Sequence, residues 1–284
     1  MKPNPAFTQL PKAFWANIRS LSQKLGYTND SGQISVPTLS EMRAAYRELE
    51  LSSSHVADRN NNLTGLGETL LAYFQHRAKV LNESVEPRLM DKAKAEKEYE
   101  KLYRELKPKC PIPMNKQKGD KKAPAYLTGI VNMLVEKHCG AFGCDYDPRR
   151  LTTVTRDKIP LRTFARRVDG AFPTAINPVA VWEIKEYYYT TTFGSRVADG
   201  VYESLLDGME LEEVREHEGI DIKHYLMVDD HFTWWSCGRS YLCRLIDMLH
   251  MGYVDEILFG SEVIEELPKL VKSWVSIAKS RSGA

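Results

Sequence analysis

Two strand-like segments at the middle of the chain constrain its fold more than any other feature. They cover 166–172 and 179–185 and are separated by a short stretch that holds two prolines. Side chains alternate along a strand, so Glu183 and Lys185 point to one face of the sheet about 7 Å apart, whereas Trp182 points to the other. The pattern predicts a hairpin whose second strand is largely buried but carries an acid and a lysine on one face.

A second acid, Asp169, lies on the first of these strands. The hairpin would bring it beside Glu183 and Lys185. Carboxylates are the ligands that Mg²⁺ prefers, and a bound metal activates water for hydrolysis. We expect Asp169 and Glu183 to be metal ligands, with the backbone carbonyl of Ile184 as a supplementary one. Lys185 would stabilise a phosphate or position water, with its pKa lowered by burial and by the metal.

The acid-x-Lys pattern also occurs elsewhere in the chain. Asp120 precedes Lys122 within a polar stretch, and Asp221 precedes Lys223 just before a predicted strand. Neither has an acidic partner strand immediately upstream across a turn. The alternative for 183–185 is an ordinary surface ion pair on an edge strand, beside an unrelated aspartate.

The rest of the chain divides into a helical part and a mixed part. Residues 1–106 have helical apolar spacing and form a predicted helical region for DNA recognition or dimerisation. Residues 107–125 hold four prolines and six lysines and are a predicted linker or DNA-contacting loop. In 126–284, strands alternate with helices, which predicts an α/β (α+β) core with a sheet flanked by helices. The individual helices are expected at 13–25, 38–49, 63–81, 89–106, 126–138, 195–206, 238–251 and 267–277, and further strands at 225–229 and 256–260.

The charge is balanced overall but unevenly distributed. The formal net charge is +1, yet 149–167 carries seven basic residues against one acid, and 107–125 is also basic. Two basic runs upstream of an acid cluster favour a polyanionic substrate. No apolar run reaches the ~18 residues that a membrane span needs. The N-terminus lacks the apolar region of a secretory signal, and five cysteines are typical of reduced thiols, so we expect a cytoplasmic protein without a membrane partner.

The acids and the lysine together resemble the motif of the PD-(D/E)xK nuclease superfamily. In that family a first acid and then acid-x-Lys lie on neighbouring strands of an αβββαβ unit, the restriction-endonuclease-like fold. Asp169 matches the first acid, Glu183 the second and Lys185 the lysine, although Val168 stands where the motif has proline. The resemblance covers roughly 126–265.

The resemblance implies further roles. The family often adds a glutamate from the first core helix, for which Glu136 is the match by order and Glu68 the rival. Mg²⁺ would be the cofactor, with Mn²⁺ as a substitute. Contacts to DNA are expected from basic and hydroxyl side chains at the start of the hairpin and after its end: Arg166, Arg167, Thr191, Ser195 and Arg196.

These expectations describe a Mg²⁺-dependent endonuclease that cuts double-stranded DNA, such as a type II restriction enzyme or another defence nuclease. A homodimer is expected because two strands must be cut. Two alternatives stay open at this point. One is a repair or RNA-processing nuclease of the same fold, and the other is a nucleic-acid-binding protein without catalysis.

Overall fold

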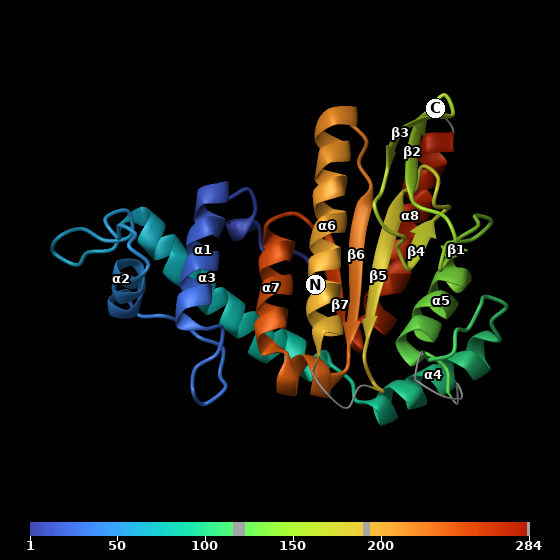
Figure 1. Ribbon diagram of the computed structural model, residues 1–284. Coiled ribbons are helices and arrows are strands. Elements are labelled where there is room, and N and C mark those ends of the chain that lie inside the picture. Colours follow the sequence, from blue (N-terminus) through green and yellow to red (C-terminus); the bar gives the residue numbers. More distant parts are fainter. Residues whose placement is uncertain (116–122, 190–193, 283–284) are drawn as a thin grey trace.

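The computed structural model describes residues 1–115, 123–189 and 194–282. Figure 1 shows an α-helical part at one end of the molecule and a sheet covered by helices at the other. The predicted mixed α/β class with an N-terminal helical region is confirmed. Within the described ranges, no helix combines the length and the apolar character that crossing a lipid bilayer requires.

The N-terminal part is built from three helices around an apolar core. After a 3₁₀ turn at Pro5–Phe7, they are α1 (Lys12–Leu25), α2 (Leu39–Glu48) and α3 (Gly65–Val80). A capping box fixes the start of α2, because Thr38 and Glu41 bond reciprocally across its first turn. The core joins Phe14 and Ile18 of α1 to other buried apolar side chains of all three helices.

The next helix belongs with the sheet. A π-helical turn (Leu81–Val85) and a 3₁₀ turn (Glu86–Arg88) lead from α3 to α4 (Lys92–Leu106). The thin apolar stripe of α4 packs on α5 (Tyr126–His138), and Tyr99 lies against Gly129. The sequence grouped this helix with residues 1–106, but its only apolar face is buried against the C-terminal part. The described ends of the predicted linker also pack there, since Asn132 donates to the carbonyl of Pro111.

The sheet has five strands in the order β1-β4-β5-β6-β7. Strand β4 is antiparallel to both β1 and β5, whereas β5, β6 and β7 are parallel. The strands are β1 (Asp145–Tyr146), β4 (Gly170–Phe172), β5 (Ala180–Glu186), β6 (Lys223–Asp229) and β7 (Glu256–Phe259). The sequence did not predict β1 or a separate hairpin of β2 (Thr153–Arg156) and β3 (Ile159–Thr163).

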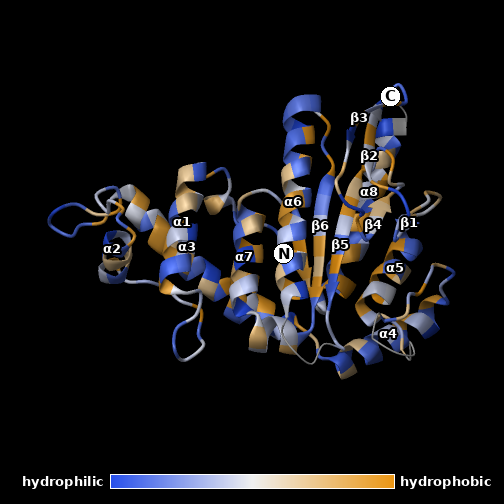
Figure 2. Ribbon diagram, viewed as in Figure 1, coloured by the Kyte–Doolittle hydropathy of each residue, from blue (hydrophilic) through white to orange (hydrophobic). Residues whose placement is uncertain are grey.

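Helices cover both faces of the sheet, as Figure 1 shows. Helix α5 and α8 (Glu262–Ser282) bury one face, where Trp182 stacks on Trp274. On the other face, β6 and β7 pack on α7 (Arg239–His250), and α6 (Ser195–Glu218) runs alongside β5 and β6. A π-helical turn at Phe232–Cys237 leads into α7. In Figure 2 both β5 and β6 carry apolar and hydrophilic segments, since β5 holds two glutamates and a lysine among its apolar residues.

A buried ion pair joins the two parts of the chain. Arg77 of α3 donates to both carboxylate oxygens of Asp247 in α7, each at 3.1 Å, and Tyr73 donates to the same carboxylate at 2.7 Å. Arg77 has no exposed surface and Asp247 very little. Because such charges are costly to leave unpaired, this contact fixes how α3 sits on α7.

Candidate active site

The two predicted acids meet at the start of β4. Asp169 directly precedes β4, and its Oδ2 accepts a 2.8 Å hydrogen bond from the backbone N–H of Ile184 on β5. The N–H of Asp169 lies 3.3 Å from Oε1 of Glu183. The antiparallel register, in which Gly170 pairs with Trp182, places these acids on adjacent strands. A strand residue directs its N–H and C=O to the same side, so the Ile184 carbonyl also faces Asp169's strand.

Lys185 lies on the same face of β5 as Glu183. Its Nζ is 2.9 Å from Oε2 of Glu183, and the two residues are only 6% and 1% exposed. The lysine stem lies along α6 at Gly200, where a Cβ would come within 3.3 Å of Lys185 Cδ. A glycine at this helical position therefore makes room for the buried lysine. The Lys185 ammonium, which the sequence analysis assigned to phosphate chemistry, thus points toward the carboxylate of Glu183.

Three further charged groups complete the cluster. Arg166 forms a two-pronged contact with Glu183, with Nη1 3.0 Å from Oε1 and Nη2 3.1 Å from Oε2. The same guanidinium contacts Asp207 at 2.6 Å and Glu203 at 3.2 Å. Glu203 also lies 3.5 Å from Lys185 Nζ. Sequence reasoning missed both α6 acids, although their spacing of four residues on one helix was a usable signal.

Opposing effects set the pKa values of the central pair. Burial acts to raise the pKa of Glu183, but the charges of Lys185 and Arg166 outweigh it and hold that pKa below its ordinary value. Burial acts to lower the pKa of Lys185, but Glu183 and Asp169 raise it above its ordinary value. The nearby carboxylates thus stabilise the ammonium more than burial disfavours it, and a lowered pKa beside a bound metal stays a prediction.

Asp207 differs from the other acids. It is fully buried, and burial followed by the charge of Glu183 raises its pKa to about 7. Its Oδ1 has no hydrogen-bond partner among the described residues. The cluster holds four carboxyl groups against two cations, which leaves a formal charge of −2, or −1 when Asp207 is protonated. A residual negative charge suits a site that takes up a cation.

The donor set fits a magnesium ion. Asp169 and Glu183 offer hard carboxylate oxygens on adjacent strands, and Mg²⁺ is commonly held by one or two carboxylates together with several waters. Within the described residues, no group of three or more His, Cys, Asp or Glu side chains is arranged around one ion-sized point. Asp169 and Glu183 are therefore the two carboxylates that could hold such an ion, with waters completing its shell.

The structure does not bring the predicted upstream glutamate to this cluster. Glu136 lies near the end of α5, on the opposite face of the sheet from Glu183, and accepts hydrogen bonds from the N–H of Lys109 at 3.2 and 3.0 Å. Its place in chain order was right, but order does not reveal which face a helix covers. The rival, Glu68, is exposed on α3 in the N-terminal part.

The predicted DNA-contacting residues have different surroundings. The guanidinium of Arg166 contacts three carboxylates, and its role in binding DNA stays a prediction. Arg167 is exposed and donates to the carbonyl of Pro148. Ser195 and Arg196 are exposed at the start of α6, and Thr191 lies outside the described residues. Ser195 and Arg196 therefore stay candidates for contacts with a phosphate backbone.

The rival acid-x-Lys sequences do not form a comparable cluster. Lys223 Nζ pairs with Asp221 at 2.7 Å and with Asp255 at 3.1 Å, and these residues are partly or largely exposed at the start of β6. Asp120 and Lys122 lie outside the described residues. Glu183 and Lys185 are thus distinguished from Asp221 and Lys223 by burial.

Comparison with known proteins assigns the chain to a family but does not indicate an activity. No curated protein and no solved structure matches it significantly. Residues 1–84 match a domain of unknown function (DUF7690), and residues 90–274 match another (DUF7687). The two matches meet just before α4, in agreement with the packing of α4 on α5. Because the second match covers well over half of the sequence and contains the whole sheet and the acidic cluster, the chain belongs to the DUF7687 family.

Proposed function

We propose that this protein is a Mg²⁺-dependent endonuclease that hydrolyses phosphodiester bonds of double-stranded DNA, of the restriction or defence type. The observation that carries the proposal is the contact of Asp169 with Glu183 and of Glu183 with Lys185 on adjoining strands. Two acids and one cation at a single spot provide ligands for a metal and a positive charge for a phosphate. An incidental surface ion pair would not be buried in this way.

The order of elements around the cluster supports the same proposal. Helix α5, strands β1, β4 and β5, helix α6 and strand β6 follow one another as helix, three strands, helix and strand, with the β2–β3 hairpin inserted. That is the αβββαβ order that the resemblance to PD-(D/E)xK nucleases implies. The acids stand at the strand positions that the motif requires. Fold order alone fits many functions, so it supports the residues and does not replace them.

The residues have separate tasks in this proposal. Asp169, Glu183 and the Ile184 carbonyl would hold the metal, which when bound supplies an activated water and neutralises charge on the phosphate. Lys185, kept charged by its acidic neighbours, stabilises negative charge that develops at phosphorus. Exposed Ser195 and Arg196 hold the DNA backbone at the start of α6, where helix amides also favour anions. A homodimer would supply one such site for each strand.

Cleavage of phage DNA with Mg²⁺, with and without EDTA, tests the proposal. We expect discrete fragments from the wild type and none with EDTA. Asp169→Asn and Lys185→Met should each lower the cleavage rate by about 10²-fold or more while DNA binding persists. Asp221→Asn and Lys223→Met are matched controls, because they alter the same acid-x-Lys pattern outside the cluster, and both should cleave normally.

Two results would contradict the proposal. One is a wild type that binds DNA but cuts neither duplex nor single strands. The other is cleavage that persists in Asp169→Asn and Lys185→Met. Parallel assays on RNA and on single-stranded DNA identify the substrate, since preferential RNA cleavage would point to a processing nuclease of the same fold. Sedimentation of the active protein with and without duplex DNA tests the dimer.

A further inference from the structure

The N-terminal part contains a polar pocket far from the acidic cluster. Its volume is about 590 Å³, and it lies between α2 and the loop that leads to α3. Figure 1 places α2 at the end of the molecule opposite β4 and β5. The pocket is lined by Leu39, Ser40, Arg43, Ala44, Arg47, Ser53 and Asn61. Two arginines, two serines and an asparagine make most of this lining hydrogen-bonding, so an apolar ligand does not suit it.

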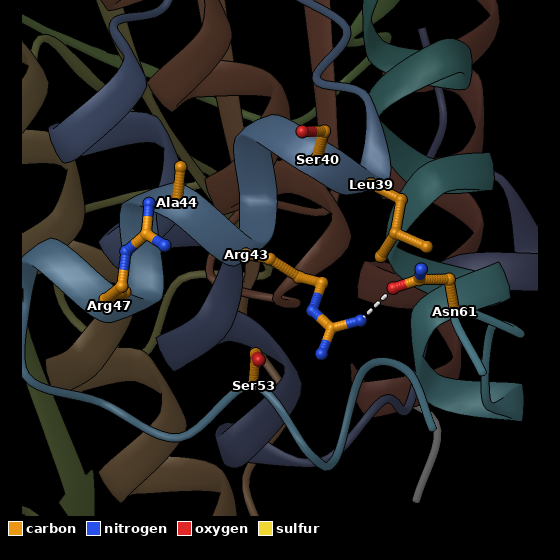
Figure 3. Close-up of a pocket in the computed structure, with 7 residues that line it drawn as sticks. All are labelled: Leu39, Ser40, Arg43, Ala44, Arg47, Ser53 and Asn61. Atoms are coloured by element: carbon orange, nitrogen blue, oxygen red, sulfur yellow. Dashed lines mark hydrogen bonds between the residues drawn. The ribbon is translucent and has the colours of Figure 1, made fainter. Parts of the chain in front are cut away.

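The two arginines give the pocket its charge. Arg43 and Arg47 are four residues apart on α2, so both side chains lie on one side of the helix. Arg43 donates to the side-chain oxygen of Asn61, as Figure 3 shows. Among the described residues, neither guanidinium forms an ion pair with a carboxylate within 4 Å. This contrasts with Arg166 and Arg77, which are both held by carboxylates.

The acids near the pocket in sequence are bound to other groups. Glu48 pairs with Lys24 at 2.6 Å, and Glu41 accepts hydrogen bonds from the N–H and hydroxyl of Thr38. Asp58 accepts hydrogen bonds from the backbone N–H groups of Asn60 and Asn62. None of these acids lines the pocket. The pocket wall therefore contains no carboxylate, although the charge of Asp58 acts on Arg43 and that of Glu48 acts on Arg47.

The rim of the pocket is held in a fixed shape. Asp58 closes the 58–62 turn through the backbone hydrogen bonds just described, and Asn61 within that turn has a positive φ of 64°. Leu39, which lies beside Asn61 in Figure 3, and Ser40 belong to the first turn of α2. An anion in the pocket would find the guanidinium of Arg43 beside Asn61 and that of Arg47 nearer to Ala44, as Figure 3 shows.

We propose that this pocket binds a phosphate-bearing small molecule of nucleotide size. Guanidinium groups match phosphate oxygens with paired hydrogen bonds, and the hydroxyls of Ser40 and Ser53 add further donors. The volume lies within the roughly 300–1,000 Å³ typical of small-ligand sites. A duplex presents its phosphates along a convex backbone, which suits an open basic face better than this pocket. The inference is independent of the proposed nuclease activity.

Calorimetric titration of the full chain with ATP and, separately, with inorganic pyrophosphate tests the pocket. We expect both to bind, and we expect Arg43→Gln and Arg47→Gln each to weaken binding by about tenfold or more. Arg59→Gln is the matched control, because Arg59 is an exposed arginine in the same loop that does not line the pocket. It should bind both probes as the wild type does. Thermal unfolding of each variant checks that the fold is kept.

Each other outcome overturns the proposal. Absence of binding by ATP and pyrophosphate at millimolar concentration excludes a phosphate pocket. Equal loss in Arg59→Gln shows that general positive charge, and not the pocket, attracts the probes. If only a duplex oligonucleotide binds and the Arg43 and Arg47 variants lose it, the phosphates belong to nucleic acid. Asp169→Asn should bind ATP unchanged, which separates this test from that of the acidic cluster.

Discussion

The Arg166 guanidinium contacts both carboxylate oxygens of Glu183, with N···O distances of 3.0 and 3.1 Å, and is a counter-ion for this acid, which is only 1% exposed. The contact spans two elements, since Arg166 precedes β4 and Glu183 lies within β5. The guanidinium also reaches Asp207 on α6. The Arg166 side chain thus connects β5 of the candidate site to α6, which covers it. Its removal should therefore lower the free energy of unfolding.

Arg166→Met should destabilise the protein by about 3 kcal/mol. The change leaves Asp207 without a cationic partner and leaves Lys185 as the remaining cation beside Glu183. Removing one partner of a buried ion pair costs about 3–5 kcal/mol. The lower end applies because the Arg166 side chain is 23% exposed. Urea unfolding measures the loss. The matched control is Arg162→Met, because Arg162 pairs with Glu213 on the surface and should contribute no more than about 1 kcal/mol. Equal losses in both variants would contradict the prediction.

Local patterns carried much of the fold and part of the site. The expected helix 126–138 coincides with α5, since its apolar spacing is bounded by a proline and a glycine. Asp169 and Glu183 could be paired because strand alternation and a turn with proline at each end are local signals. These features depend on neighbours within about twenty residues, which a sequence displays directly.

The missing parts depend on contacts across the fold. Arg166 and Asp207 are 41 residues apart and meet only because α6 lies over β5. The basic run 149–167 was interpreted as a substrate-binding feature, and its polar residues concealed the β2–β3 hairpin. Glu136 was assigned to the site by order alone, whereas the side of the sheet that α5 covers is decided by tertiary packing.

The free energy of unfolding of the wild type should fall as the pH rises from about 4 to about 7, and Asp207→Asn should remove part of that fall. Burial and Glu183 raise the pKa of Asp207 from 3.8 to about 7. In that window the folded state holds a proton that the unfolded state has released, so the contribution of Asp207 to stability, present below about pH 4, falls as pH rises and is lost above about pH 7. Asparagine does not titrate, so relative to the wild type the variant should gain roughly 2–4 kcal/mol between about pH 4 and pH 8.

Urea unfolding of both proteins at several pH values in this range checks the Asp207 prediction. Asp229 and Glu186 also have raised pKa values, of about 7 and about 6, so both proteins should still lose stability with rising pH. The difference between the two curves isolates Asp207. A difference that does not change with pH would show that Asp207 is already ionised at the acidic end of this range.

Arg77→Met should cost about 3–5 kcal/mol, because it leaves Asp247 as a buried charge without its cation. Adding Asp247→Asn removes that charge, so the double variant should be less destabilised than the sum of the single changes. Urea unfolding of the four proteins gives the coupling energy. Strict additivity would mean that Arg77 and Asp247 do not stabilise each other.

Gly170→Ala tests how closely β4 approaches β5 beside the candidate site. A Cβ at Gly170 would lie 2.1 Å from Cε2 of Trp182, whose ring is fixed by stacking on Trp274. The strand must move, and overpacking of this kind typically costs about 1–3 kcal/mol. Because Asp169 is the adjacent residue, the same movement should separate it from Glu183 and lower any Mg²⁺-dependent cleavage.

Gly65→Ala is the control, since nothing lies within 4 Å of its added Cβ, and its unfolding free energy should stay equal or rise slightly. Wild-type stability in Gly170→Ala would mean that the indole moves aside freely and that β4 is not held by this contact.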